Sequence, residues 1–485
     1  MANAPITTNP LAPGWLATPT DANAFADGLW PSGITRKAGE LVIGGVSATE
    51  LAARYGTPLY IIDETDVRAR AQEIRTAFET EFARIGTTAR VYYAGKAFLS
   101  TEVARWMVGE GLNIDVCSGG ELAVTLAAGI DPARLGFHGN NKSLGEIDDA
   151  TRVGIGTIII DSAIEVDRVA AAAERNGTVQ SVRLRVNSGV HAHTHEYLAT
   201  SHEDQKFGVT LEEAPGLVGA IRSHDSLRFE GLHCHIGSQI FDADGFGESA
   251  SRLLGVHAAL LAGGPVPQLN LGGGFGIAYT TADTPTPIRE LAARIADIVA
   301  DECARLGIPL PGVAFEPGRW IIGPAGITLY SAGTTKAVDV SGASRLYVSV
   351  DGGMSDNARP ALYGADYSVR MANRVSDAEP ALVRIAGKHC ESGDIVVDAD
   401  YLPGDVAPGD LLAVAATGAY CWSLASNYNY LGRPAVVAVR DGESRVLVRG
   451  ETIDDLLARD TGVGGVSTSA TTDRTTTNEQ RNTGR

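Results

Sequence analysis

Lys96 is the first residue whose type and position suggest chemistry. It directly follows the apolar run VYYAG at residues 91–95 and therefore stands at the end of a predicted strand. Burial in a partly apolar mouth would lower the pKa of its amine and make the amine a nucleophile toward a carbonyl group. A lone lysine at a strand end is more often an ordinary surface residue, so Lys96 needs support from other positions.

Two further segments could bind a phosphate or a planar ring. LNLGGGFG (269–276) places glycines directly after a strand, where backbone N–H groups can approach a phosphate, although loops also use glycine for positive φ. HCHIGSQ (233–239) places His233 and His235 on the same face of a strand. These histidines could be bases, ring partners, metal ligands or hydrogen-bonded core residues. We disfavour a metal, since no nearby set of carboxylates and histidines completes its usual ligands.

Two more segments carry acidic, basic or thiol groups. In FEPGRW (315–320), Glu316 and Arg319 leave an apolar strand together, and they could act on a ligand or form an internal ion pair. In KHCESGD (388–394), Cys390 stands beside a glutamate and could supply a proton or a nucleophile. An isolated cysteine is more often buried and inert. None of these segments determines a function by itself.

The order and wording of these segments resemble a known family. The resemblance, from about residue 40 to 455, is to the barrel-type pyridoxal-phosphate decarboxylases, which include the ornithine, arginine and diaminopimelate enzymes. The wording is most similar to the diaminopimelate enzymes at HEDQKFG (202–208) and SDNARPALYGA (355–365). The motifs that carry the resemblance together are YAGKA, HIGSQ, LGGGFG, EPGR, SDNARPALYGA, HCESGD and GAYCWSLASNYN.

The resemblance implies a carboxy-lyase that uses pyridoxal 5'-phosphate to convert meso-2,6-diaminopimelate to L-lysine and CO2, the last step of lysine biosynthesis. One alternative is a decarboxylase of ornithine, lysine or arginine on the same fold, which the motif wording opposes. Another is a non-catalytic relative that binds pyridoxal phosphate. The presence of Lys96, Glu316 and Cys390 together opposes it, since such a protein has no chemical need for all three.

The resemblance also implies a role for each matching residue at the cofactor. Lys96 would hold the cofactor covalently, the ring of His235 would stack on it, and Glu316 would pair with its ring nitrogen. A carboxylate at that place keeps the ring protonated and makes it a better electron sink. Asp115 and Arg185 match positions that line the pocket. The residues expected to bind the cofactor are Lys96, His235, Ser238, Gly273, Gly274, Glu316, Pro317, Gly318, Arg319 and Tyr420.

For the substrate, the resemblance implies a carboxylate clamp and a group that recognises an amino centre. Arg319, Arg359 and Tyr363 match carboxylate-binding positions, Glu391 matches the amino-recognising group, and Tyr420 matches a residue that touches both cofactor and substrate. Two arginines can grip carboxylates in bidentate fashion. A monocarboxylic diamine precursor needs no clamp for a second carboxylate, so the pair favours a substrate with two.

The catalytic residues that the resemblance implies are Lys96 and Cys390. Cys390 matches the proton donor that quenches the carbanion left by CO2. In this family the cysteine comes from the neighbouring subunit, so the resemblance implies a homodimer with two composite sites at its interface.

The elements that must position these residues follow from the pattern of apolar runs. Between residues 58 and 325, short apolar runs alternate with helical stretches, which predicts an α/β fold with a parallel (β/α)8 barrel of the TIM type. Barrel enzymes keep their sites at the carboxyl ends of the strands, and the motifs described above stand at or near the ends of predicted strands. The strand candidates are residues 58–63, 89–95, 112–116, 136–139, 157–161, 181–187, 229–237, 268–274 and 312–318.

Outside the barrel, the sequence predicts four other parts. Residues 1–35 form an extended arm, and residues 36–57 form an N-terminal strand and helix that join the β domain. Residues 326–460 form this C-terminal domain, an antiparallel β-barrel or sandwich, because β-branched runs alternate there with Gly, Pro and Asp turns. Residues 461–485 contain almost no large apolar side chain and are expected to be disordered.

Composition bounds the class of protein. A length of 485 residues suits two or three domains. The net charge, 40 − 58 = −18, disfavours nucleic acid and anionic membranes as partners and is compatible with a small amino-acid substrate. Five scattered cysteines without a CxxC pair predict reduced thiols in a cytoplasmic protein. The N-terminus lacks the pattern of a signal peptide, and TIIIDSAI is too short to span a bilayer.

Overall fold

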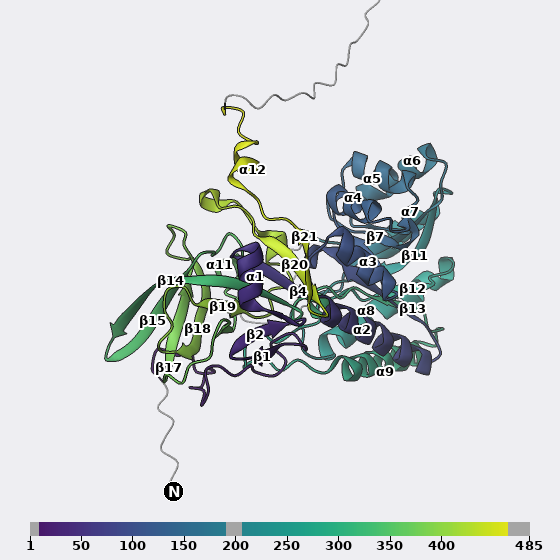
Figure 1. The fold of residues 1–485 in the computed structure, drawn as a ribbon. Helices are drawn as coiled ribbons and strands as arrows, with labels where there is room; N and C mark the ends of the chain where they lie inside the picture. Colours follow the sequence, from purple (N-terminus) through teal and green to yellow (C-terminus); the bar gives the residue numbers. More distant parts are fainter. Residues whose placement is uncertain (1–8, 191–205, 464–485) are drawn as a thin grey trace, which may run out of the picture.

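The computed structural model describes residues 9–190 and 206–463. Parts of three segments with predictions lie outside these ranges. They are residues 1–8 of the arm, 202–205 of HEDQKFG and 464–485 of the tail. The described chain forms a helix-covered barrel and, beside it, a β domain (Figure 1).

Eight parallel strands close the barrel and confirm the predicted (β/α)8 architecture. The strands are β5 (Ala89–Ala94), β6 (Asn113–Val116), β7 (Leu135–Phe137), β8 (Thr157–Ile160), β9 (Gln180–Asn187), β11 (Leu227–His233), β12 (Gln268–Asn270) and β13 (Gly312–Phe315). The parallel pairings β13–β5 and β8–β9 complete the circuit. A short strand, β10 (Val209–Thr210), adds to the end of β9. All eight carboxyl ends therefore lie at one rim.

The barrel helices form because apolar side chains recur on one face of each, and polar caps begin several of them. The helices are α2 (Glu64–Arg84), α3 (Thr101–Gly109), α4 (Gly119–Ala127), α5 (Leu144–Arg152), α6 (Ala163–Arg175), α7 (Ala214–Arg222), α8 (Asp244–Leu260) and α9 (Ile288–Leu306). Ser100 caps α3, and Ser143 forms a capping box with Glu146 on α5. Phe78 of α2 stacks on Phe315 of β13 with ring centroids 3.9 Å apart, which fixes this helix on the barrel.

The strand β4 (Leu59–Asp63) lies before α2 in the chain but belongs to the β domain. It pairs antiparallel with β14 (Gly326–Val340) and parallel with β20 (Ala435–Arg440). The prediction that residues 58–63 form a barrel strand is therefore wrong. Every residue of β4 is buried, so its apolar run fits the interior of either sheet and does not identify the partner strands.

The β domain follows the barrel, and its sheet is mixed, not purely antiparallel as predicted. Its remaining strands are β15 (Ala343–Val350), β16 (Val369–Met371), β17 (Pro380–Ala386), β18 (Ile395–Pro403), β19 (Leu411–Val414) and β21 (Glu443–Val448). Most neighbours are antiparallel, but β15 pairs in parallel with β17, and β20 with β4. Parallel neighbours need a long connection. For β4 and β20 that connection contains the entire barrel.

The N-terminal segment packs on the β domain, as the fold prediction expects. Leu41 shares an apolar core with Ile327 and Val437, and its N–H donates to the carbonyl of Ala372 at 2.8 Å. Trp30 of the predicted arm is buried in the same core. The elements of this segment are β1 (Thr35–Lys37), β2 (Glu40–Ile43), β3 (Val46–Ser47) and α1 (Ala48–Tyr55).

The described chain ends just beyond α12 (Ile453–Leu457), a short helix capped by Thr452. No helix in the described ranges is long and apolar enough to cross a membrane.

Candidate active site

Polar side chains from six barrel strands converge at the rim formed by the carboxyl ends. Their positions at or just beyond strand ends are where a parallel barrel concentrates functional groups. The contributing residues are Lys96 after β5, Asp115 on β6, His138 after β7, His233 and His235 at the end of β11, Asn270 on β12, and Glu316 after β13.

Glu316 lies at the centre of this cluster, where it accepts from Asn270 and His233 and forms an ion pair with His138. Asn270 Nδ2 donates to Glu316 Oε1 at 2.6 Å, and His233 Nε2 lies 3.1 Å from Oε2. His138 Nε2 lies 3.3 Å from Oε1 and also 3.2 Å from Asp115 Oδ1. A carboxylate offers about four acceptor positions, so these contacts leave room for one more donor.

The charges in the cluster follow from burial and from these contacts. Burial alone would raise the pKa of Glu316, but His138 and His233 together outweigh it and hold that pKa well below its ordinary value. Burial likewise lowers the pKa of His138, yet Glu316 and Asp115 raise it overall to about 9. Burial lowers the pKa of His233 to about 4, against the pull of Glu316. Glu316 is therefore an anion, His138 a cation, and His233 a neutral donor through Nε2.

Asp115 and Arg185, two positions that the resemblance places along the pocket, differ in their surroundings. Burial, with the negative charge of Glu316, raises the pKa of Asp115 to about 6. The guanidinium of Arg185 lies 4.2 Å from the ring centroid of Phe207 and 3.9 Å from Asp161 Oδ1. Asp115 on β6 and Arg185 on β9 thus come from strands that are separated by β7 and β8 in the barrel.

Lys96 projects from a single turn of 3-10 helix, η1 (Gly95–Ala97), directly after β5. Its side chain is exposed, whereas its two neighbours in the turn are buried. The expectation that Lys96 is desolvated in an apolar mouth is therefore not met. The amine still lies close enough to His235 to help lower the pKa of that imidazole well below its ordinary value, after burial itself, which is the main cause.

The Lys96 turn is bonded to the other predicted motifs. Ala94 N donates to Pro317 O at 3.0 Å, and a Cβ on Gly318 would lie 3.0 Å from Ala94 O, so the EPGR segment lies against the turn. Tyr420 N donates to Ala97 O at 2.8 Å. Tyr420 itself has a φ of +62°, a strained conformation for a non-glycine residue of the kind that clusters at functional sites.

The glycine turn lies against two backbones at once. A Cβ on Gly273 would lie 2.0 Å from the carbonyl oxygen of Glu316, and a Cβ on Gly274 would lie 2.5 Å from that of Gly237. Gly274 also has a φ of +117°. Gly273 N donates to His235 Nδ1 at 3.3 Å. The turn therefore requires glycine and joins the HIGS and EPG segments, as a cradle for a phosphate would.

Arg319 links three of the predicted residues. Its Nη2 donates to Ser238 Oγ at 2.8 Å, and its guanidinium carbon lies 4.7 Å from the ring centroid of Tyr420. Its Nη1 donates to the hydroxyl of Tyr279. The predicted residues Ser238, Arg319 and Tyr420 thus meet at the border between barrel and β domain.

Arg359 begins α11 (Arg359–Tyr363) and is buried, with 6% of its surface exposed. Its Nη1 donates to Tyr367 Oη at 2.6 Å, and its guanidinium carbon lies 4.8 Å from the ring centroid of Tyr279. The two predicted substrate arginines, Arg319 and Arg359, therefore contact the same tyrosine.

Cys390, Glu391 and Tyr363 do not join the barrel cluster. Cys390 and Glu391 are exposed in the loop between β17 and β18, and Tyr363 is 61% exposed. Among the residues that the structure describes, no hydrogen bond or ion pair connects these three with the cluster. The loop is anchored by its neighbour His389, whose Nε2 lies 2.8 Å from Ser355 Oγ.

Sequence reasoning missed four functional candidates, namely His138, Asn270, Tyr279 and Tyr367. His138 and Asn270 stand within predicted strands, and a polar residue in such an apolar run was the signal available. The structure also brings one ligand atom each of His138, His233 and Glu316 within 4.8 Å of one another. We therefore correct the expectation that no nearby carboxylates and histidines complete a metal site, since these three residues form such a group. Both histidines already contact Glu316 directly through their Nε2 atoms.

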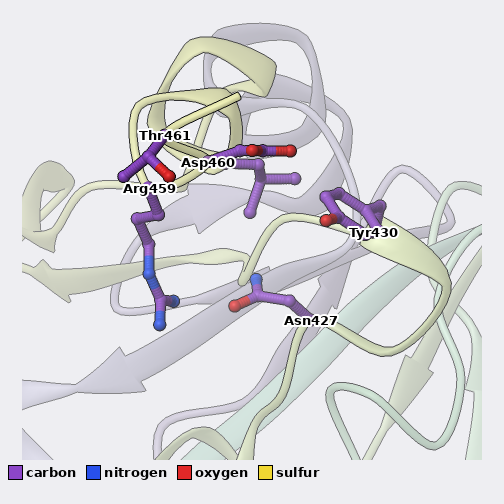
Figure 2. A pocket seen from close by; sticks show the side chains of 6 residues that line it. Asn427, Tyr430, Arg459, Asp460 and Thr461 are labelled. Carbon is purple, nitrogen blue, oxygen red and sulfur yellow. The ribbon is translucent and has the colours of Figure 1, made fainter. Parts of the chain in front are cut away.

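A cavity of about 490 Å³ lies elsewhere, between the loop at residues 427–430 and the C-terminal segment around α12 (Figure 2). None of its lining residues belongs to the barrel cluster. They are Asn427, Tyr430, Leu456, Arg459, Asp460 and Thr461.

Comparisons with known proteins identify the relatives of this chain. The family described as pyridoxal-dependent decarboxylase, pyridoxal binding domain, matches residues 64–323. The diaminopimelate decarboxylase of Mycobacterium tuberculosis is 52% identical over 444 residues, which cover 90% of this chain and 98% of that protein. The diaminopimelate decarboxylase of Bacillus subtilis is 43% identical over 426 residues, covering 87% and 95%.

Solved structures agree with these relatives. The crystal structure of diaminopimelate decarboxylase from M. jannaschii matches with a TM-score of 0.82 at 30% identity, over 89% of this chain and 98% of that one. A lysine/ornithine decarboxylase from Vibrio vulnificus, at 21% identity and a TM-score of 0.67, shows the shared fold alone. The chain therefore belongs to the pyridoxal-dependent decarboxylase family, within its group of diaminopimelate decarboxylases.

Proposed function

We propose that this protein decarboxylates meso-2,6-diaminopimelate to L-lysine and CO2, with pyridoxal 5'-phosphate as its cofactor. The observation that carries the proposal is the Glu316 carboxylate, which lies in the segment bonded to the Lys96 turn. Asn270, His233 and His138 contact it, and the two histidines keep it ionised. The curated relatives support the substrate by name, and the M. jannaschii relative is also known in a complex with L-lysine.

The residues at the barrel rim fit this cofactor. The glycine turn packs directly against the backbones of Glu316 and Gly237, which a Cβ would prevent, and Glu316 has room for one more donor. Lys96 would hold the cofactor covalently, and the ring of His235 would lie against it. The residues proposed to complete the site are Ser238, Gly273 and Gly274 at the phosphate, and Pro317, Gly318, Arg319 and Tyr420 around it. When bound, the cofactor supplies a sink for the electron pair left after CO2 departs.

Glu316 would hold a proton on the ring nitrogen of the cofactor. Its pKa lies well below the ordinary value, so it is anionic at neutral pH and attracts that proton. His138, His233 and Asn270 fix its orientation before the cofactor arrives. The charge is thus preorganised, and no reorientation is needed during the reaction.

Arg319 and Arg359 would bind the substrate carboxylate that remains in the product. Both guanidiniums contact Tyr279, so they lie close enough together to converge on one carboxylate. Planar guanidiniums match carboxylates in bidentate geometry. Tyr363, Glu391 and Tyr420 are the further substrate contacts that we propose. Ornithine, lysine and arginine have no second carboxylate, so this clamp favours a dicarboxylic substrate over them.

Cys390 would donate the proton that replaces CO2, and we propose that it does so in the active site of a second subunit. It is exposed in the β domain, away from the cluster of its own chain. Large exposed side chains that could pack against a partner include Leu362, Tyr363, Leu424, Tyr428 and Tyr430, each at least 39% exposed. The loop that carries Tyr428 and Tyr430 is tied to the cysteine loop, because His389 Nδ1 lies 3.0 Å from Asn429 Oδ1.

We further propose that the protein works in the cytoplasm. The proposed role of Cys390 needs a reduced thiol, and all five cysteines are described as free thiols. A reducing compartment keeps such thiols available.

The substrate proposal is tested by CO2 release from the purified protein offered meso-diaminopimelate, ornithine, lysine and arginine separately. We expect release from meso-diaminopimelate alone. Equal release from ornithine or lysine would overturn the substrate while leaving the reaction type intact. The cofactor proposal is tested by Lys96→Ala, which should lack the visible absorption of the bound cofactor, whereas the distant Lys336→Ala should retain it.

A further inference from the structure

Tyr279, in the loop between β12 and α9, lies between the two arginines proposed to bind the substrate. Its hydroxyl accepts a hydrogen bond from Arg319 Nη1, and its ring faces the Arg359 guanidinium at 4.8 Å from the centroid. Only 5% of the tyrosine is exposed. One side chain thus contacts both cations, through its polar tip and its aromatic face.

The position of Tyr279 is itself fixed from several sides. Its ring packs edge-to-face on Tyr367, with centroids 5.2 Å apart and an interplanar angle of 78°. Its backbone N–H donates to Asp283 Oδ2 at 2.9 Å, and Ser368 Oγ donates to its carbonyl at 3.1 Å. Ser368 precedes β16, so the β domain and the barrel loop hold the tyrosine together.

Two guanidiniums this close to one ring repel each other unless something offsets their charge. The negative face of an aromatic ring attracts one cation, and the hydroxyl oxygen attracts the other. Tyr279 therefore sets both the separation and the orientation of Arg319 and Arg359. Arg319 Nε is buried and has no hydrogen-bond partner among the described residues, so this arginine retains a donor for a ligand.

We propose that Tyr279 is a positioning residue that determines specificity, because it holds Arg319 and Arg359 in the geometry that grips the carboxylate retained in the product. This inference rests on the proposed function, in which these arginines bind that carboxylate. Neither the motifs nor the proposed roles above assign anything to Tyr279. Without it, the two arginines would remain but would no longer converge.

The test compares two competitive ligands that differ by one carboxylate. L-lysine and cadaverine share the carbon chain and both amines, but only L-lysine carries the carboxylate. Tyr279→Phe keeps the ring and removes the hydroxyl that Arg319 uses. We expect about tenfold weaker inhibition by L-lysine, the cost of losing one hydrogen bond to a charged group, with unchanged inhibition by cadaverine. KM for meso-diaminopimelate should rise by a similar factor, with kcat changed less.

Tyr279→Leu removes the ring as well, so its loss of L-lysine affinity should exceed that of Tyr279→Phe. It also keeps the inference testable if the first variant folds poorly. The visible absorption of the bound cofactor reports folding in each preparation. Tyr401→Phe is the matched control, because Tyr401 is a buried tyrosine of β18 whose hydroxyl bonds Thr18 and, among the described residues, no part of the site. It should change neither inhibition constant.

Three outcomes separate the possibilities. Selective loss of L-lysine binding in both Tyr279 variants supports the inference. Unchanged binding, or equal weakening of L-lysine and cadaverine, overturns it while the proposed function stands, provided that the wild type acts on meso-diaminopimelate. If the wild type releases no CO2 from meso-diaminopimelate, the proposed function fails, and the inference fails with it.

Discussion

Glu316 has a carboxylate whose charge and orientation the surrounding side chains determine. Replacing it by glutamine keeps its size and removes the charge. We expect Glu316→Gln to lower kcat by roughly 10²- to 10³-fold, the usual effect of losing one preorganised electrostatic group, because the ring nitrogen loses its anionic partner. The visible cofactor absorption should persist, since Lys96 is intact. Measurement of kcat and of the absorption spectrum checks this, and unchanged turnover would contradict the role of Glu316.

His138 makes stability depend on pH in a defined window. Its folded-state pKa of about 9 lies above the ordinary value of 6.5, so its contribution to stability is complete below pH 6.5 and is lost as pH rises through about 9. Asp115 and Glu316 have folded-state pKa values below this window, at about 6 and well under 4.5. We expect wild-type Tm to fall by roughly 3 to 6 °C across the window and that of His138→Gln to fall much less.

His257→Gln is the matched control for that experiment. His257 is a buried histidine on α8, and burial lowers its pKa to about 4. Its contribution is therefore lost only as pH falls from 6.5 toward 4, the opposite direction. Thermal melts between pH 6.5 and 9 should show the wild-type slope in this control. A wild-type slope in His138→Gln would remove His138 as the source.

The site residues that the sequence predicts stand in distinctive local motifs, whereas the residues that it misses do not. Lys96, Gly273 and Glu316 stand in segments whose glycines, charges and strand ends are unusual together. Asn270 is a single polar residue between two leucines, and Tyr279 is followed by two threonines in a loop without an unusual motif. Their roles depend on partners far along the chain: barrel closure brings Glu316 near Asn270, and the packing of the β domain on the barrel brings Arg359 near Tyr279.

At the scale of elements, the glycine turn after β12 connects the site to the barrel. Gly273→Ala would place a Cβ against the carbonyl of Glu316, at 2.0 Å in the present geometry. We expect several degrees' loss in Tm and weaker cofactor binding, because one of the two backbones must move. Gly255→Ala on α8 has nothing within 4 Å and should be neutral or stabilising. Equal Tm and cofactor affinity in the two variants would contradict the cradle.

The periodic pattern identifies the barrel but not the partners of every strand. Nine apolar runs were available for eight barrel positions, and the extra one, β4, is continuously buried between β14 and β20. An apolar run records burial on both faces and carries no information on which sheet supplies it. The domain boundary between residues 325 and 326 therefore remains a proposal. β4 and the N-terminal segment precede this boundary in the chain but pack in the β domain that follows it.

At the scale of the whole molecule, the proposed dimer makes a prediction that a monomeric site does not. Cys390→Ala should slow turnover while the visible cofactor absorption remains. Lys96→Ala should be inactive. If each site combines Lys96 of one chain with Cys390 of another, mixing the two variants under subunit exchange rebuilds one site per mixed dimer, giving about a quarter of wild-type activity. Activity that stays at the level of the separate variants would contradict the composite site.

The central claim is that Lys96 and its neighbours support decarboxylation of meso-diaminopimelate. The most direct measurement follows CO2 and L-lysine together in a single reaction of the purified protein with pyridoxal 5'-phosphate and meso-diaminopimelate. We expect equimolar formation of the two products by the wild type and neither product with Lys96→Ala. Release of CO2 without L-lysine, or full activity in Lys96→Ala, would contradict the central claim.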